Sequence, residues 1–201
     1  RVIKIPDNNM DFFTASTLPI ALATMHNAIV TIGNFTKGQT ILIQGASSGV
    51  GLMGLQIAKH LGAKLVIGTS TKQEKFDKLK SIGADLVVNS KDKDWVDQVL
   101  QATNNKGVDL IIDQLSGYTL NKNMSASKIK GTIVNVGRLA GGNTEFNCDL
   151  HALRRINYHG VTFRTRSISE IRDVYSKMWN DLSYLVTSRK LSLPIYKIFE
   201  F

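Results

Sequence analysis

Apolar residues along this chain form short continuous runs, and between them apolar positions recur at helical spacing. Runs of four to six residues without polar alternation are typical of strands that are buried on both faces of a parallel sheet. A turn or a polar stretch bounds each run, which favours strands over parts of longer helices. The pattern predicts six strands, at residues 40–44, 64–68, 85–88, 108–112, 131–136 and 160–164.

Helical patterns separate these strands. Residues 52–61, 72–82 and 95–102 each carry apolar positions on one helical face, and a further helical stretch follows the fourth strand. A last helix begins near Glu170, because Ser167 and Glu170 have the spacing of a capping box. Regular alternation of strands and helices predicts an α/β fold, a doubly wound parallel six-stranded Rossmann sheet with helices on both faces.

The two ends of the chain fall outside this alternation. Residues 14–32 have the pattern of a helix before the first strand, and residues 193–199 have that of a strand after the last helix. That last strand has no partner in the predicted sheet, so we expect it to belong to another domain. We therefore divide the chain into a linker at 1–13, a dinucleotide-binding domain at 14–187 and a C-terminal segment at 188–201.

Composition narrows the classes of partner. The chain has 201 residues and a net charge of +9, but its lysines are spread through segments such as 72–80 and 122–130 without interleaved aromatic residues. This distribution favours a solvated basic surface, and we expect no nucleic-acid partner. We find no apolar run that approaches the ~20 residues of a membrane span and no secretory signal, so we expect a cytoplasmic protein without a membrane partner.

Cysteine and histidine usage bears on disulfides and metals. Cys148 is the one cysteine of the chain, which excludes an internal disulfide. The four histidines have no spacing typical of a zinc site. We therefore expect no bound metal.

Residues 45–51, with the sequence GASSGVG, lie where the first predicted strand becomes a helix. Small residues let the backbone approach a pyrophosphate, and the start of a helix offers unpaired N–H groups and a positive dipole end. Residues 49–54 also match the G-x-G-x-x-G pattern of dinucleotide-binding turns. A tight turn selected only for packing has the same composition, but the strand before and the helix after favour dinucleotide binding.

The end of the second predicted strand bears on the choice of cofactor. An NAD-specific domain usually has an acidic residue there, which binds the adenosine ribose. This chain has Thr69 and Ser70, followed by Lys72 and Lys75. Hydroxyl and ammonium groups would bind a 2′-phosphate that a carboxylate would repel, so the sequence predicts NADPH. The alternative for both lysines is an ordinary solvated helix surface.

Two dehydrogenase families match parts of this pattern. The glycine-rich turn resembles that of the short-chain dehydrogenases, and Tyr118 and Lys122 have the spacing of their catalytic pair. In that family, however, the pair lies much further from the turn, on a later helix and after a catalytic serine. Tyr118 directly follows the fourth predicted strand, so we interpret it as a surface residue.

The medium-chain dehydrogenase/reductase superfamily fits nearly the whole chain. Residues 14–24 resemble the helix before its cofactor domain, residues 40–62 resemble its glycine-rich region, and residues 131–137 resemble its fifth strand. Residues 46–51 are similar to the quinone oxidoreductase and enoyl reductase branch, which is independent of zinc, whereas alcohol dehydrogenases have a third glycine in place of Ser48. One departure is Ser90, where some relatives have a tyrosine that packs on the adenosine end.

This resemblance implies a set of cofactor contacts. The glycine-rich turn would hold the pyrophosphate, and residues after the second strand would hold the 2′-phosphate. The nicotinamide end would lie near the helix at 14–32 and the end of the fifth strand, and a basic residue after the sixth strand would contact a phosphate or ribose. The residues implied are Thr24, Ala46, Ser47, Ser48, Gly49, Val50, Gly51, Thr69, Ser70, Lys75, Val136, Gly137 and Arg166.

The resemblance also implies an activity: hydride transfer from NADPH to a quinone or an activated alkene as small-molecule substrate. The alternatives are an enoyl reductase acting on an acyl thioester and a dinucleotide-binding module without turnover. We assign no catalytic residue, because in this branch the protein mainly orients the cofactor. A GroES-like domain, most of it outside these 201 residues, would supply the substrate pocket, so we expect this part alone to be inactive.

An exposed edge predicts self-association. The order 3-2-1-4-5-6 leaves the sixth strand at the edge of the sheet, where apolar residues occur without proline or lysine. Relatives of the quinone reductase type pair through this edge. We therefore expect a homodimer through residues 160–166, with the strand near Phe163 antiparallel to its symmetry mate.

Overall fold

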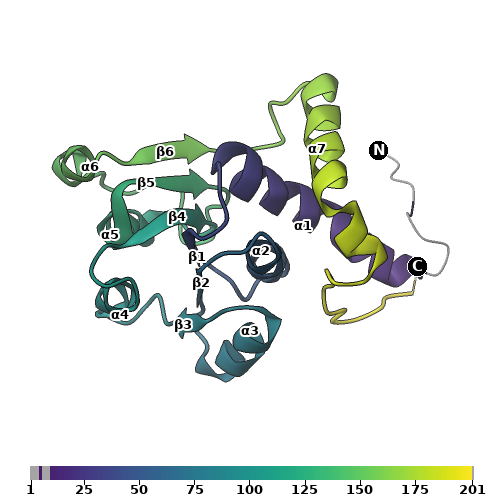
Figure 1. The fold of residues 1–201 in the computed structure, drawn as a ribbon, viewed down its shortest axis with the longest axis horizontal. Coiled ribbons are helices and arrows are strands. Elements are labelled where there is room, and N and C mark those ends of the chain that lie inside the picture. The colour runs from purple at the N-terminus through teal and green to yellow at the C-terminus, as the bar shows by residue number, and fades with distance from the viewer. Residues whose placement is uncertain (1–4, 6–9, 201) are drawn as a thin grey trace.

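A computed structural model of the chain describes residue 5 and residues 10–200 and shows one six-stranded sheet (Figure 1). All neighbouring strands are parallel, and their order is β3-β2-β1-β4-β5-β6. Both the architecture and the strand order confirm the prediction. The strands are β1 Thr40–Ile43, β2 Leu65–Thr69, β3 Leu86–Val88, β4 Val108–Asp113, β5 Ser127–Asn135 and β6 Asn157–Gly160.

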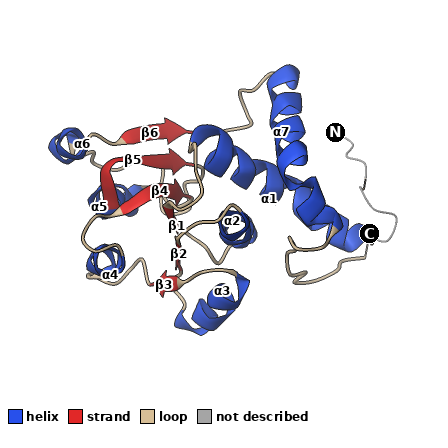
Figure 2. Ribbon diagram, viewed as in Figure 1, coloured by secondary structure: helices blue, strands red, loops and turns tan. Residues whose placement is uncertain are grey.

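Helices cover both faces of this sheet. Three of them, α4, α5 and α6, lie on one side, whereas α1, α2 and α3 lie on the other and α7 packs outside α1 (Figure 2). The α-helices are α1 Phe12–His26, α2 Gly49–His60, α3 Phe76–Ile82, α4 Trp95–Ala102, α5 Leu120–Ala126, α6 Cys148–Arg154 and α7 Ile168–Thr187. A π-helix, η1 Asn27–Ile32, and two 3-10 turns, η2 Gln73–Lys75 and η3 Gly117–Thr119, complete the elements.

Alternate residues of the central strands feed two hydrophobic cores. Ile41 and Ile43 of β1 pack into the core shared with α1, α2 and α7, whereas Leu42 packs into the core shared with α4 and α5. All three side chains are fully buried. Each contributes roughly 1.5–3 kcal/mol relative to an exposed side chain, which explains why a four-residue strand holds its place in the sheet.

The sixth strand is displaced from its predicted position. It was expected at residues 160–164, but β6 is Asn157–Gly160 and residues 161–166 form an irregular segment. All four residues of β6 are exposed, so the strand carries no hydrophobic pattern. Val161 is one of the apolar residues on which the predicted strand was based, and it is buried just beyond the end of β6.

Two other elements differ from the predicted pattern. β5 begins at Ser127, four residues before the expected start, because a bulge interrupts its pairing with β4 and places Lys130 at a φ of 63°. The helix α6 was not predicted. No side chain in α6 is buried, so it lacks the apolar face by which the other helices were recognised.

The N-terminal helix is longer than expected. Most of the linker at 1–13 lies outside the described residues, and α1 already begins at Phe12, capped by Asp11. From Phe12 to Ile32 the helix is 21 residues long with a mean hydropathy of 1.3, which is long and apolar enough for a membrane span, so the expectation of no such run was wrong. Half of it is buried in the fold, as in the core helices of globular domains.

α7 fixes this helix from outside and begins as predicted. The side chain and backbone of Ser167 and Glu170 form the expected capping box. Further along α7, Asp181 Oδ2 lies 2.7 Å from Nε2 of the buried His26 in α1. After α7, the strand expected at 193–199 does not form, because no described strand lies beside it to share hydrogen bonds.

Candidate active site

The glycine-rich turn lies at the carboxyl end of β1, in the middle of the sheet. Ser48 is the N-cap of α2, and its Oγ accepts a hydrogen bond of 3.0 Å from the N–H of Gly51. The N–H groups of Gly49 and Val50 have no carbonyl within α2 to bond, because they belong to its first turn. Together with the helix dipole, these donors form a site suited to a phosphate.

The three glycines of the G-x-G-x-x-G match have different roles. A methyl group on Gly49 would meet no atom within 4 Å outside its own helix, so this position faces open space. A methyl group on Gly51 would lie 2.6 Å from the carbonyl oxygen of Gly45, and one on Gly54 would lie 3.0 Å from Sδ of Met25. Gly51 and Gly54 therefore let α2 pack closely on the turn and on α1, whereas Gly49 borders the space where a ligand would bind.

A buried polar network supports the turn from below. Thr69 Oγ1 accepts a 2.9 Å hydrogen bond from the N–H of Gly45 and donates one of 2.8 Å to Oε1 of Gln44. Nε2 of Gln44 in turn donates to Oδ1 of Asn123 on α5, at 2.6 Å. Thr69 is completely buried, so its observed role is to fix the turn, and its expected cofactor contact stays a prediction.

A second set of hydrogen bonds reaches the turn from the end of β4. Nε2 of Gln114 lies 2.9 Å from the carbonyl oxygen of Gln44 and 3.4 Å from that of Gly45. Oε1 of Gln114 accepts a 3.0 Å hydrogen bond from Oγ of Ser48. Sequence reasoning missed Gln114, although its place immediately after a central parallel strand was a usable signal.

Asp113, the last residue of β4, organises the neighbouring loop. Its Oδ1 accepts hydrogen bonds of 2.9 Å from the N–H groups of both Leu115 and Ser116. The carboxyl group is fully buried, and burial raises its pKa above the usual range although these two hydrogen bonds act in the opposite direction. Its backbone oxygen accepts from the N–H groups of Val136 and Gly137, at 2.8 and 3.1 Å.

Val136 and Gly137, predicted to lie at the nicotinamide ribose, are thus held against the end of β4. A methyl group on Gly137 would lie 2.6 Å from the carbonyl oxygen of Gln114, so glycine permits this close approach. The Gly137 carbonyl also accepts a 2.8 Å hydrogen bond from Oγ of Ser116. Both residues are only partly buried, which leaves them accessible at the same edge of the sheet as the glycine-rich turn.

Three predicted contact residues line one pocket. Ser47, Gly49 and Lys75 border a cavity of about 410 Å³ between the start of α2 and the helix α3. Lys78 lines the same cavity, three residues after Lys75, and sequence reasoning missed it although this spacing places both lysines on one helical face. The cavity therefore combines a helix N-terminus with two ammonium groups, the chemistry that recognises phosphates.

Ser70 and Ser90 follow the neighbouring strands β2 and β3 and do not line this pocket. Ser70 has a side-chain oxygen that accepts a 3.2 Å hydrogen bond from the N–H of Lys72, and the residue is 4% exposed. Ser90 Oγ is buried without a hydrogen-bond partner. Both hydroxyls are thus mostly covered, and Ser70 shapes the loop that leads to Lys75.

Arg166 lies near the end of α1, the helix that carries Thr24. The Arg166 Nε donates a 2.9 Å hydrogen bond to the carbonyl oxygen of Thr162, and its Nη2 lies 3.4 Å from Oδ1 of Asn27. Asn27 is one helical turn beyond Thr24, so the guanidinium lies near the helix end that carries Thr24. Nδ2 of Asn27 is buried without a partner.

The sequence predicts that Tyr118 is a surface residue and that the chain binds no metal. Tyr118 lies in the 3-10 turn η3 and is 49% exposed, as a surface residue would be. Within residue 5 and residues 10–200, no three His, Cys, Asp or Glu side chains are arranged to hold a metal ion.

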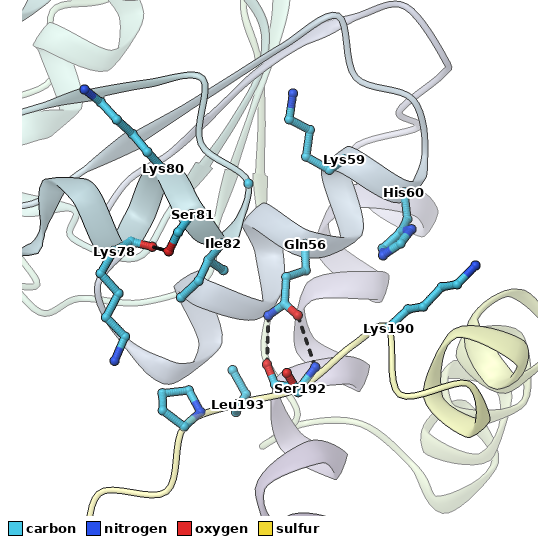
Figure 3. Close-up of a pocket in the computed structure, with 12 residues that line it drawn as sticks. Gln56, Lys59, His60, Lys78, Lys80, Ser81, Ile82, Lys190, Ser192 and Leu193 are labelled. Atoms are coloured by element: carbon cyan, nitrogen blue, oxygen red, sulfur yellow. Dashed lines mark hydrogen bonds between the residues drawn. The ribbon is translucent and has the colours of Figure 1, made fainter.

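A second pocket, of about 550 Å³, lies where the C-terminal segment crosses α2 and α3. Gln56 holds that segment in place, because its amide both donates to and accepts from the backbone of Ser192, at 2.9 and 3.1 Å. The ammonium groups of its lining lysines point in different directions instead of converging on one point (Figure 3). Leu193 and Pro194 border both this pocket and the pocket of Gly49 and Lys75. The C-terminal segment therefore forms a wall between the two pockets.

The sequence and the fold match known proteins. Residues 49–181 match the family model described as zinc-binding dehydrogenase. Highly reducing polyketide synthase 40 of Fusarium pseudograminearum is 30% identical over 207 residues, which cover 98% of this chain and 8% of that protein. The chain spans less than a tenth of the length of such curated relatives.

Two solved structures share the fold. The JamJ enoyl reductase in its apo form has a TM-score of 0.82 at 24% identity, with 98% of this chain and 58% of that chain covered. The Escherichia coli quinone oxidoreductase complexed with NADPH also has a TM-score of 0.82, at 22% identity, with 94% and 57% covered. Both likenesses are at the level of the fold.

Proposed function

The chain belongs to the zinc-binding dehydrogenase family, as a cofactor-binding domain of the medium-chain dehydrogenase/reductase superfamily, and from this premise we propose that it binds NADPH for the reduction of an activated alkene. One observation carries the proposal: Gly49 at the start of α2 and Lys75 beside α3 border the same cavity. A helix N-terminus suits the pyrophosphate, and an ammonium group suits the 2′-phosphate.

The residues present fit a dinucleotide. The open space beside Gly49 accommodates a phosphate that a side chain would exclude, and Lys78 adds a second cation to the cavity. Val136 and Gly137 lie at the same edge of the sheet and are accessible for the nicotinamide ribose. Ser70 lies where an NAD-specific domain usually has an acidic residue, and this difference favours NADPH over NADH.

We favour an enoyl thioester as the substrate, because the curated relatives described above are polyketide synthases. NADPH would supply the hydride to the β-carbon of the double bond, and a proton from water or a buffer acid would complete the α-carbon. We assign no side chain of this chain as the proton donor. Its residues bind the cofactor and hold it beside the substrate.

A quinone reductase is the second candidate, supported by the likeness of the fold to the quinone oxidoreductase complexed with NADPH. Both candidates use the same cofactor geometry, so the substrate pocket would decide between them. A third possibility is a binding module without turnover.

One experiment separates these functions. The 201-residue chain is titrated with NADPH by fluorescence. Because the substrate pocket is expected in a GroES-like domain, NADPH oxidation is followed with the protein that includes that domain, using a short trans-2-enoyl thioester and a benzoquinone. Oxidation by the thioester supports the enoyl reductase, and oxidation by the quinone alone supports the quinone reductase. Binding without oxidation favours the binding module, and failure to bind NADPH refutes the proposal.

We also propose a homodimer, with its interface moved to β6. This strand is the exposed edge of the sheet, and Tyr158 within it is 38% exposed. An exposed strand edge offers unpaired backbone groups to a second copy of the chain. Phe163, at the centre of the interface first expected, lies beyond the strand and packs its ring under the guanidinium of Arg166, at 5.4 Å.

A further inference from the structure

We propose that Gln114 is a positioning residue for the dinucleotide: its carboxamide binds the backbone carbonyl oxygens of Gln44 and Gly45 and the N-cap hydroxyl of α2, and so fixes the glycine-rich turn in the form that receives the pyrophosphate. The inference rests on the proposed function, because it concerns the same phosphate site. It assigns to the end of β4 a role that the glycine-rich sequence itself does not reveal.

The first step is geometric. The Nε2 group of Gln114 lies within hydrogen-bonding distance of both carbonyl oxygens, 2.9 Å from that of Gln44 and 3.4 Å from that of Gly45. The side chain is 5% exposed, so water does not compete for these bonds. The Gln44 carbonyl therefore faces β4, whereas the Gly45 carbonyl is held both by Gln114 and by Ser48, whose N–H and Oγ lie 3.1 and 3.0 Å from it.

The second step is electrostatic. A carbonyl oxygen carries partial negative charge and repels a phosphate, so a turn binds pyrophosphate only when its N–H groups face the ligand and its carbonyl groups do not. A carboxamide has two N–H donors on one nitrogen, which suits it to hold two neighbouring carbonyl oxygens. Neither a carboxylate nor an apolar side chain at this position offers a donor.

The third step links Gln114 to the helix start. Its Oε1 accepts the 3.0 Å hydrogen bond from Oγ of Ser48, and the same Oγ accepts the N–H of Gly51. Gln114 and the Gly45 carbonyl oxygen, which lies 3.0 Å from the same Oγ, therefore both hold the capping hydroxyl beside the free N–H groups of the first turn of α2. One side chain acts on both the carbonyl and the N–H side of the phosphate site.

The test is the substitution Gln114→Glu, which keeps the size of the side chain and removes its N–H donors. At pH 8 the introduced carboxylate faces two carbonyl oxygens, and we expect the NADPH dissociation constant to rise at least tenfold. At pH 5.5 a protonated carboxyl group regains one donor, so the ratio of variant to wild-type dissociation constants should fall below threefold. A merely structural role for Gln114 would weaken the binding of NADPH and of 2′-AMP in parallel, so the two ligands are compared.

Two controls make the result specific. Gln101→Glu adds the same charge on the exposed surface of α4 and should change NADPH affinity less than twofold. Binding of 2′-AMP, which lacks the pyrophosphate, should change less than threefold in Gln114→Glu. If that variant does not fold, Gln114→Met is measured, with severalfold weaker NADPH binding and unchanged 2′-AMP binding expected.

The outcomes are distinguishable from those of the proposed function. Wild-type protein that does not bind NADPH refutes the proposed function itself. Wild-type binding with a variant affinity within twofold at pH 8, or a loss that is the same at pH 8 and pH 5.5, overturns the role of Gln114. An equal loss of NADPH and 2′-AMP binding overturns it as well.

Discussion

Gly49 and Gly51, two residues apart at the start of α2, face in opposite directions. A methyl group on Gly49 would project into open space, whereas one on Gly51 would lie 2.6 Å from the carbonyl oxygen of Gly45. One glycine therefore keeps room for a ligand, and the other keeps room for the protein's own backbone. Two similar residues in one motif should respond differently to the same substitution.

We expect Gly49→Ala to weaken NADPH binding at least tenfold without loss of stability, because the methyl group meets no protein atom but narrows the phosphate site. Alanine is also the better helix former, by roughly 0.5–1 kcal/mol. Gly51→Ala is the matched variant and should lower the free energy of unfolding by about 1–3 kcal/mol through overpacking. Urea unfolding and NADPH titration of both variants test this, and full binding by a folded Gly49→Ala would contradict the assigned site.

Lys75 should determine the preference for NADPH over NADH. A charge-assisted hydrogen bond contributes about 1.5–3 kcal/mol, and partial solvent exposure reduces this, so Lys75→Ala should lower the affinity ratio by roughly threefold to tenfold. Lys80→Ala removes the same charge from the adjoining helix α3, outside the cavity of Gly49, and serves as the control. Calorimetric titration with both cofactors gives the ratio, and equal ratios in wild type and Lys75→Ala would rule out this contact.

Asp113 should make stability depend on pH. Burial raises the pKa of its carboxyl group in the folded protein above the ordinary value of 3.8, so the folded state binds the proton more tightly than the unfolded state. Its contribution to stability is therefore present below pH 3.8 and declines as the pH rises through the folded pKa.

Asp113→Asn removes this titration and keeps an oxygen that can accept from the N–H groups of Leu115 and Ser116. We expect the variant to gain stability relative to wild type between pH 4 and pH 7. Urea unfolding at several pH values measures the difference, in which the other titrating groups cancel. A difference in stability that does not change with pH would show that burial does not raise the pKa of Asp113.

The sequence was sufficient to predict the sheet because its central strands are buried on both faces. Leu42 and Ile111 have no exposed surface, so a polar residue cannot easily replace either of them. β6 was placed three residues too late and α6 was missed for the converse reason, since all residues of β6 are exposed and α6 buries none. Hydrophobic pattern identifies an element only where the element buries something.

The candidate site was predictable where it depends on the local chain. The glycine-rich turn and Lys75 lie in segments whose spacing is visible in the sequence, and the structure places Ser47, Gly49 and Lys75 around one cavity. Gln114 lies 66 residues after Ser48, and only the pairing of β1 with β4 brings them together. The position of Gln114 after β4 was visible in the sequence, but its contact with Ser48 depends on the tertiary structure and was not.

The last prediction concerns the dimer and uses the hydrogen-bonding direction of β6. Val161 donates its N–H to the carbonyl oxygen of Asn135 in β5, and N–H directions alternate along a strand, so the N–H groups of Tyr158 and Gly160 point to the open edge. Tyr158→Pro removes one outward donor and leaves the bonds to β5 intact. Light scattering should show a dimer for the wild type and for Phe163→Pro, whose substitution lies beyond the strand, but a monomer for Tyr158→Pro. A monomeric wild type at about 100 μM, a concentration that populates a dimer of micromolar affinity, would refute the dimer. A dimeric Tyr158→Pro would place its interface away from β6.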